Sequence, residues 1–132
     1  MIHKVNISTK AKVEFRDITQ VIRDVISLAH IRNGTCYIFV PHTTAGVTIN
    51  EHADPSVVKD IGSHFDVMVP QHDNYRHMEG NSPAHIKATL VGSSETLLID
   101  DEKLVLGTWQ GVFFCEFDGP RNRMLLIKIV PD

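Results

Sequence analysis

The chain has 132 residues, of which 42% are hydrophobic and 22% charged, and its formal net charge is −3. This length and composition indicate one domain with a core of its own and argue against a disordered chain. The acidic balance, without any cluster of lysines and arginines, argues against nucleic acid as the main partner.

The sequence also predicts a cytoplasmic protein without a membrane partner. The N-terminus lacks the basic, apolar and cleavage regions of a secretory signal. No apolar run is long enough to span a membrane. The two cysteines, Cys36 and Cys115, lie in apolar strand-like runs and match no metal-binding pattern. Buried free thiols in a reducing compartment are the simplest interpretation of them.

The N-terminal third predicts two strands followed by a helix. Residues 2–7 and 13–15 alternate apolar with polar side chains, as two strands of a half-buried antiparallel pair do. Residues 18–29 then repeat their apolar side chains with a helical period. Asp17 is the expected cap of this helix, and Gln20 is expected to complete a capping box.

The next segments predict an interior strand, a shorter strand and a second helix. Residues 35–40 are rich in β-branched and aromatic side chains, and residues 47–50 resume the alternation of a strand. Asp54 is the expected cap of the second helix, whose first position is Pro55.

A polar stretch at residues 73–85 predicts a loop, because it is dense in turn-forming and charged side chains around one glycine. Ser82 and Pro83 then have the pattern of a helix cap and first helical position, with a short helix over residues 84–90. Four further strands are expected, at residues 95–99, 103–106, 109–117 and 123–130. The whole predicts an α+β fold, a mostly antiparallel sheet or sandwich-like system with two or three helices.

Three clusters of polar side chains stand at the ends of these predicted elements. The first contains His42, Thr43, Thr44, Asn50 and Glu51, the second contains Asp73, Asn74, His77, Asn81 and His85, and the third contains Glu116, Asp118 and Arg121. Neither a phosphate-binding glycine loop nor a nucleophilic serine motif is present, which disfavours those classes of site. A metal site or an anion-binding site is what the clusters predict.

The histidines are the best candidates for ligands of a divalent metal. His42, His77 and His85 would leave an open position, as catalytic zinc sites do. Their spacing matches no helical metal motif, so histidines hydrogen-bonded within loops and core are an equal alternative. Glu51 and Glu116 are candidates for a general base or for carboxylates that orient a histidine, although each is equally interpretable as a solvated acid.

Arg121, in a Gly-Pro turn, has two possible roles. Its guanidinium suits bidentate binding of a phosphate or carboxylate, and a hairpin tip or a subunit contact is the alternative.

The motifs resemble those of one family. Residues 42–51, HTTAGVTINE, resemble the signature HTTAGxxxNE of the YjbQ family of small proteins, which are also described as secondary thiamine-phosphate synthases. Further matches are Asp73-Asn74 with His77, Gly80-Asn81, Ala84-His85, residues 106–110 and residues 116–121. These motifs occur in family order and cover nearly the whole chain. Ser82-Pro83 stands where a glycine is often found, which should stiffen the loop.

The resemblance implies a homotrimer with a site lined by His42, His77 and His85. The implied activity joins hydroxymethylpyrimidine diphosphate to thiazole phosphate and releases diphosphate. Zinc suits the histidine cluster, whereas magnesium, the usual partner of diphosphate, prefers oxygen ligands. The other expected contacts with substrate or anion come from Thr43, Thr44, Asn50, Asp73, Asn74, Asn81 and Arg121.

Two other functions remain open. One is a metal-dependent hydrolase of a small phosphorylated or acylated metabolite, with a zinc-bound water and Glu51 or Glu116 as base. The other is a non-catalytic trimeric module that binds a small anion.

Overall fold

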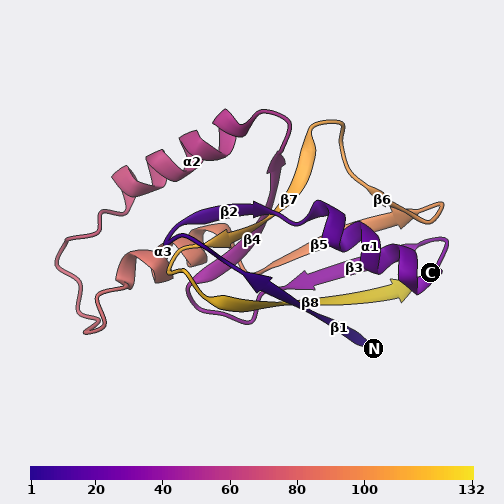
Figure 1. Ribbon diagram of the computed structural model, residues 1–132, viewed down its shortest axis with the longest axis horizontal. Helices are drawn as coiled ribbons and strands as arrows, with labels where there is room; N and C mark the ends of the chain where they lie inside the picture. The colour runs from indigo at the N-terminus through magenta and orange to yellow at the C-terminus, as the bar shows by residue number, and fades with distance from the viewer.

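Eight antiparallel strands in two sheets and three helices make up the fold, which confirms the predicted α+β class (Figure 1). The structure is a computed structural model that describes residues 1–132. One sheet has the order β1 (Ile2–Ser8), β8 (Asn122–Pro131), β3 (Gly34–Phe39), β5 (Ser94–Asp100) and β6 (Lys103–Val105). The other has the order β2 (Glu14–Asp17), β7 (Gln110–Glu116) and β4 (Ala45–Glu51).

The predicted pairing of the first two strands is wrong. β1 pairs with β8 and β2 pairs with β7, so the chain changes sheets between them. Alternation identifies a half-buried strand but contains no information on its neighbour, and both partners lie about a hundred residues further along the chain. β7 and β8 likewise flank one turn and belong to different sheets.

The main core lies between the sheets and α1 (Thr19–Ala29). Apolar side chains of α1 and of the inner strand faces are fully buried there, among them Ile22, Val47, Phe114 and Ile127. The predicted cap of α1 is off by one residue: Ile18 occupies the cap position, and Asp17 before it accepts hydrogen bonds from the N–H and hydroxyl of Thr19. Gln20 does not complete a capping box, because its amide donates to Asp24 one turn later.

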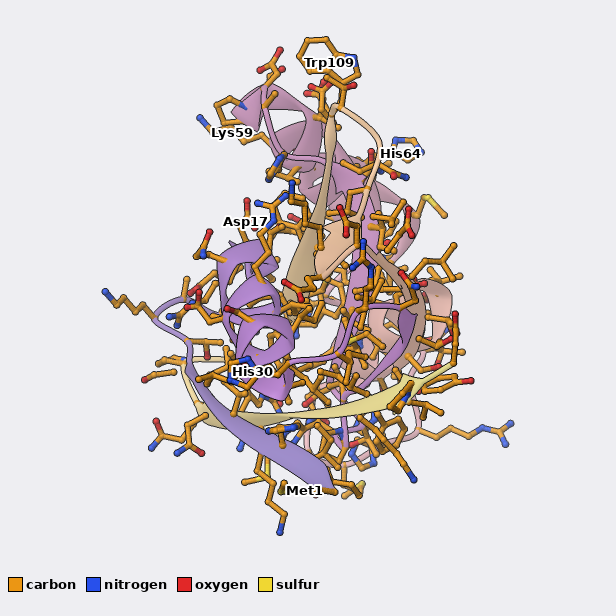
Figure 2. The ribbon with its side chains drawn as sticks, turned by 90° about the vertical axis from the view of Figure 1, so that its right-hand side faces the viewer. Met1, Asp17, His30, Lys59, His64 and Trp109 are labelled. Carbon is orange, nitrogen blue, oxygen red and sulfur yellow. The ribbon has the colours of Figure 1, made fainter.

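α2 (Pro55–Met68) begins as predicted, with Asp54 accepting a hydrogen bond of 2.9 Å from the backbone N–H of Ser56. None of its residues is buried, and Figure 1 shows the helix lying apart from the sheets on one side of the molecule. Trp109, on the turn before β7, is 63% exposed and points outward at the edge of the molecule (Figure 2). The tryptophan is therefore not part of the core of this chain.

α3 (Ser82–Val91) confirms the predicted short helix but has a different cap. Asn81 rather than Ser82 occupies the cap position, and its side chain makes no capping bond. The Asn81 amide instead donates to the carboxylate of Asp118 at 3.0 Å, which ties the start of α3 to the loop between β7 and β8.

Both cysteines are free and buried, as predicted. Burial raises the pKa of the Cys36 thiol to about 11, so this thiol stays protonated and unreactive at neutral pH. Among the helices, none combines the length and the apolar character that crossing a membrane requires.

Candidate functional site

A polar cleft of about 650 Å³ opens where the end of β3, the loop before α3 and the start of β8 meet. Its volume lies in the range of about 300–1,000 Å³ that is typical of small-molecule sites. Seven of the predicted site residues line it, namely His42, Thr43, Thr44, His77, Asn81, His85 and Arg121. The fold therefore brings together three segments that lie far apart in the sequence.

Asn50 and Glu51 do not belong to this cleft. β4 begins beside the cleft, where Ala45 pairs with Glu116, and it ends where Glu51 pairs with Gln110. A strand advances about 3.3 Å per residue, so roughly 20 Å separates Glu51 from Ala45, the end of β4 that lies beside the cleft. Within one chain, Glu51 therefore does not line the cleft with His42, because the motif that contains both spans a whole strand.

Asp73 and Asn74 also lie outside the cleft. Both are exposed in the loop between α2 and α3, and the Asp73 carboxylate accepts a hydrogen bond of 2.7 Å from the Asn74 backbone. This local bond shapes a turn. The loop contributes its later residues, from His77 onward, to the cleft.

A buried ion pair supports the floor of the cleft. The Glu116 carboxylate is fully buried and accepts hydrogen bonds from the Arg123 guanidinium, of which the Nε bond measures 2.9 Å. Thr9 donates to the same carboxylate at 2.7 Å, and the Asp118 N–H donates at 3.1 Å. Arg123 also donates to the Thr44 hydroxyl at 2.8 Å. The pair thus joins the end of β7 to β8 and holds Thr44 at the cleft.

Glu116 is therefore a positioning residue, and its predicted role as general base lacks support. Burial raises the pKa of its carboxyl, but the hydrogen bonds from Arg123, Thr9 and Asp118 outweigh burial and leave the pKa below its ordinary value. The carboxylate is ionised at neutral pH with both oxygens occupied, so it has no free position from which to take a proton.

Two arginine side chains keep donors free at the cleft. Arg123 uses Nε and Nη2 within the protein. Arg121 donates from Nε to the backbone carbonyl of Asp118 at 2.8 Å and from Nη2 to the Asp118 carboxylate at 3.1 Å. Nη1 of each has no partner in the chain, and both residues line the cleft. The two carboxylates hold the guanidiniums in place and offset their charge. An oxyanion would therefore be recognised by directed N–H donors more than by net charge.

His42 lies beside these arginines as a neutral ring. Its Nε2 accepts a hydrogen bond of 2.9 Å from the Met124 N–H, which requires the remaining proton to be on Nδ1. Burial and then the positive charge of Arg123 lower the pKa of the ring. The residue thus offers one further N–H donor, and the nitrogen that accepts is not free for a metal.

The predicted zinc site does not fit the residues of one chain. The rings of His77 and His85 meet edge to face with centroids 5.2 Å apart, while Nε2 of His42 is occupied by a backbone donor. No group of three or more histidine, cysteine or acidic side chains is arranged to hold a metal ion. A catalytic zinc needs three such ligands with their lone pairs directed at one point.

The lowered pKa of His42 predicts a pH dependence of stability. The unfolded chain takes up a proton at His42 as the pH falls through about 6.5, whereas the folded chain resists protonation, so folding is weakened. Above that pH the ring is neutral in both states and this loss is absent. We expect His42→Gln, whose amide oxygen can accept the Met124 N–H in place of Nε2, to flatten the fall of the urea midpoint between pH 7 and pH 5. An unchanged slope would contradict the assignment.

The sequence alone did not single out Arg123, which is central to the cleft. The pattern of the strand nevertheless marked it, because Arg123 shares the buried face of β8 with two apolar side chains, Leu125 and Ile127. A charge on the buried face of a strand indicates an ion pair, and the apolar run around Glu116 contains the other charge.

Known proteins closely match this sequence and structure. The family described as UPF0047 protein YjbQ-like matches residues 3–132. The chain is 52% identical to UPF0047 protein MJ1081 of Methanocaldococcus jannaschii, over 100% of this chain and 96% of that protein. It is 46% identical to UPF0047 protein YugU of Bacillus subtilis, over 98% of this chain and 99% of that protein.

The solved structures agree. A YjbQ/UPF0047 family protein from Clostridium acetobutylicum superposes with a TM-score of 0.95 at 46% identity, over 97% of this chain and 99% of its own. A protein of unknown function from Sulfolobus solfataricus also gives a TM-score of 0.95, at 32% identity over 100% of this chain and 97% of its own. The chain therefore belongs to the YjbQ-like family, UPF0047.

Proposed function

We propose that the cleft binds a small phosphorylated metabolite. One observation carries this proposal: three N–H donors, Nη1 of Arg121, Nη1 of Arg123 and Nδ1 of His42, have no partner in the chain and belong to residues that line one cleft. Planar guanidinium forks and preorganised neutral donors are the groups that bind phosphate oxygens.

The reaction that this arrangement supports best is the joining of hydroxymethylpyrimidine diphosphate to thiazole phosphate. The thiazole nitrogen attacks the methylene carbon, a C–N bond forms, and the C–O bond to diphosphate breaks. Diphosphate leaves with the bonding electrons, so no oxidant or reductant is required. The tasks of the protein are to hold both substrates together and to stabilise the charge of the leaving group. Arg121, Arg123 and His42 supply donors for that charge.

A metal-dependent hydrolase is less well supported. Glu51 lies at the far end of β4, and Glu116 is committed to Arg123. Neither of the two carboxylates that the sequence suggested is therefore available in the cleft of one chain as a general base. The non-catalytic anion-binding module would use the same cleft as the synthase and would differ only in lacking turnover. A turnover assay therefore separates these two hypotheses.

Arg121→Met and His85→Ala provide the test of the proposed function. We expect the parent protein to form thiamine phosphate from the two substrates, and each variant to lose at least about tenfold in kcat/KM, equivalent to about 1.4 kcal/mol of transition-state binding. Lys59→Met on α2 is the control, because this exposed residue lies outside the cleft. Turnover by both variants at the parent rate would refute this site. Diphosphate binding without turnover would instead support the anion-binding module.

The outer face of the five-stranded sheet supports the proposed homotrimer. Tyr37, Leu98, Val105 and Val130 are 48%, 58%, 46% and 40% exposed, and the strand register places them on this same face. Phe39, on the same face, also lines the cleft. A large exposed apolar face is typical of a surface that another chain covers. A second copy seated there would border the cleft.

Leu98→Arg tests the assembly. We expect light scattering to give the parent protein three times the chain mass of 14.8 kDa, and the variant a lower mass, because a charge in an apolar interface is strongly unfavourable. Leu28→Arg is the matched control, since Leu28 lies on α1 and is 74% exposed away from this face. A parent protein that elutes as a monomer would contradict the proposal.

A further inference from the structure

The end of β4 that lies away from the cleft carries side chains to which the cleft gives no role. We call this region the tip, and it contains the residues where β4 ends and β7 begins, namely Asn50, Glu51, His52, Trp109 and Gln110. Four of them belong to motifs that the sequence singled out, at residues 42–51 and 106–110, yet none of the five lines the cleft. Trp109 projects from the edge of the molecule (Figure 2). The tip is therefore a candidate for contact with another molecule.

Hydrogen bonds fix the shape of the tip. The Gln110 N–H donates to the Gly107 carbonyl at 3.1 Å, and the Gly107 N–H donates to Oε1 of Gln110 at 2.8 Å. The His52 N–H donates to the Trp109 carbonyl at 3.0 Å, and Asp17 holds the His52 ring through Nδ1 at 2.8 Å. A tryptophan on such a preorganised turn loses little freedom when a partner covers it, and tryptophan is enriched at the centres of protein interfaces.

Glu51 brings an unpaired negative charge to the tip. Its backbone N–H donates to Oδ1 of Asn50 at 2.7 Å, but its carboxylate has no hydrogen-bond or ion-pair partner in the chain. The cleft has the opposite property, because Nη1 of Arg121 and of Arg123 has no partner there. Tip and cleft are thus complementary in charge. Within one chain they cannot meet, since the length of β4, roughly 20 Å, separates them.

A closed ring of three copies brings two different surfaces of the chain together, because each copy meets the next head to tail. The outer face of the five-stranded sheet supplies one surface, and it reaches the cleft at Phe39, which is 47% exposed. The tip supplies the second. Its indole matches the apolar face, and its carboxylate matches the arginine donors, so the same docking satisfies both features.

We propose that the tip of each copy closes the cleft of the next copy, so that Glu51 of the neighbouring copy completes the site. The inference rests on the proposed function and its homotrimer. In that reaction the neutral thiazole nitrogen becomes a positively charged thiazolium as the C–N bond forms and the C–O bond to diphosphate breaks. The arginine donors hold the departing diphosphate, and the carboxylate from the neighbouring copy stabilises the positive charge that forms.

Cross-linking tests this contact without any assay of turnover. The double variant Thr43→Cys with Glu51→Cys places one thiol at the cleft and one at the tip, and a short bis-maleimide joins only thiols that lie close together. We expect covalent trimers on a denaturing gel. The native Cys36 and Cys115 are buried and do not react. Thr43→Cys with Leu28→Cys is the matched control, since Leu28 is exposed on α1, and it should remain a single chain on the gel.

Mixed trimers test whether the site is shared between copies. Glu51→Gln and Arg121→Met are each expected to lose at least about tenfold in kcat/KM when alone. When the two variants are co-expressed in equal amounts, about one interface in four joins an intact cleft to an intact tip, so about a quarter of the parent turnover should return.

The outcomes separate this inference from the proposed function. A parent protein that is trimeric but gives no covalent trimer in the double variant, or a mixture no more active than its two components, overturns the shared site. Covalent trimers from a protein that forms no thiamine phosphate overturn the proposed reaction and support the contact between tip and cleft.

Discussion

Arg123→Met is expected to lower the free energy of unfolding by about 3–5 kcal/mol and to abolish diphosphate binding at the cleft. The Arg123 side chain is 5% exposed, and its Glu116 partner is fully buried. Removing the guanidinium leaves a buried carboxylate with only the donors from Thr9 and Asp118. An uncompensated buried charge is among the few single changes that remove a large part of the stability of a small domain.

The double variant Glu116→Leu with Arg123→Met separates stability from binding. Replacing both members of a buried pair with apolar groups is often neutral, so we expect most of the lost stability to return. Diphosphate binding should not return, because the Nη1 donor is still missing. Arg32→Met serves as control: its pair with Asp101 is exposed at both ends and should be worth no more than about 1 kcal/mol. A double variant as unstable as the single one would contradict this account of Arg123.

Gly46→Ala is expected to cost about 1–3 kcal/mol or more, although only one methyl group is added. A Cβ on Gly46 would lie 2.5 Å from the backbone oxygen of Gly92, at the end of α3. That oxygen accepts a hydrogen bond of 3.0 Å from Val47, so α3 must move away from β4 and lose this bond. Because α3 contributes His85 to the cleft, we expect diphosphate binding to weaken as well.

Gly62→Ala is the matched control for this change. Gly62 lies within α2, and a Cβ there meets only the Phe15 ring at 3.4 Å. Alanine should stabilise the helix by about 0.5–1 kcal/mol, because glycine loses more backbone entropy on folding. Urea unfolding at one fixed protein concentration measures both variants. A Gly46→Ala protein with the parent midpoint would show that α3 is free to shift without loss.

The local elements were largely predictable from sequence, whereas their arrangement was not. Asp54 and Pro55 correctly predicted the start of α2, and the dense apolar run at residues 35–40 predicted an interior strand. Both predictions succeed because helix caps and side-chain periodicity depend only on neighbouring residues. The sheet partners of β1 and β2 depend on contacts about a hundred residues away. The alternation of apolar and polar side chains along a strand does not depend on those distant contacts, so it could not predict which strands pair.

The sequence likewise predicted which histidines belong to the candidate site but not what their ring nitrogens contact. His42, His77 and His85 were expected to share a site, and all three line the cleft. Their expected role as zinc ligands depended on which nitrogen faces the cleft. For His42 the backbone N–H of Met124 makes that choice, and it lies 82 positions away in the sequence. Glu51 lies outside the cleft of its own chain because a motif that is continuous in sequence runs along a strand and away from the cleft.

The position of α2 predicts where the fold opens first. A helix without a buried residue is held by few contacts, and such elements open by local unfolding at a small fraction of the global free energy. The backbone amides of α2 should therefore exchange their hydrogens with solvent faster than those of the two sheets, which stay folded while the helix opens.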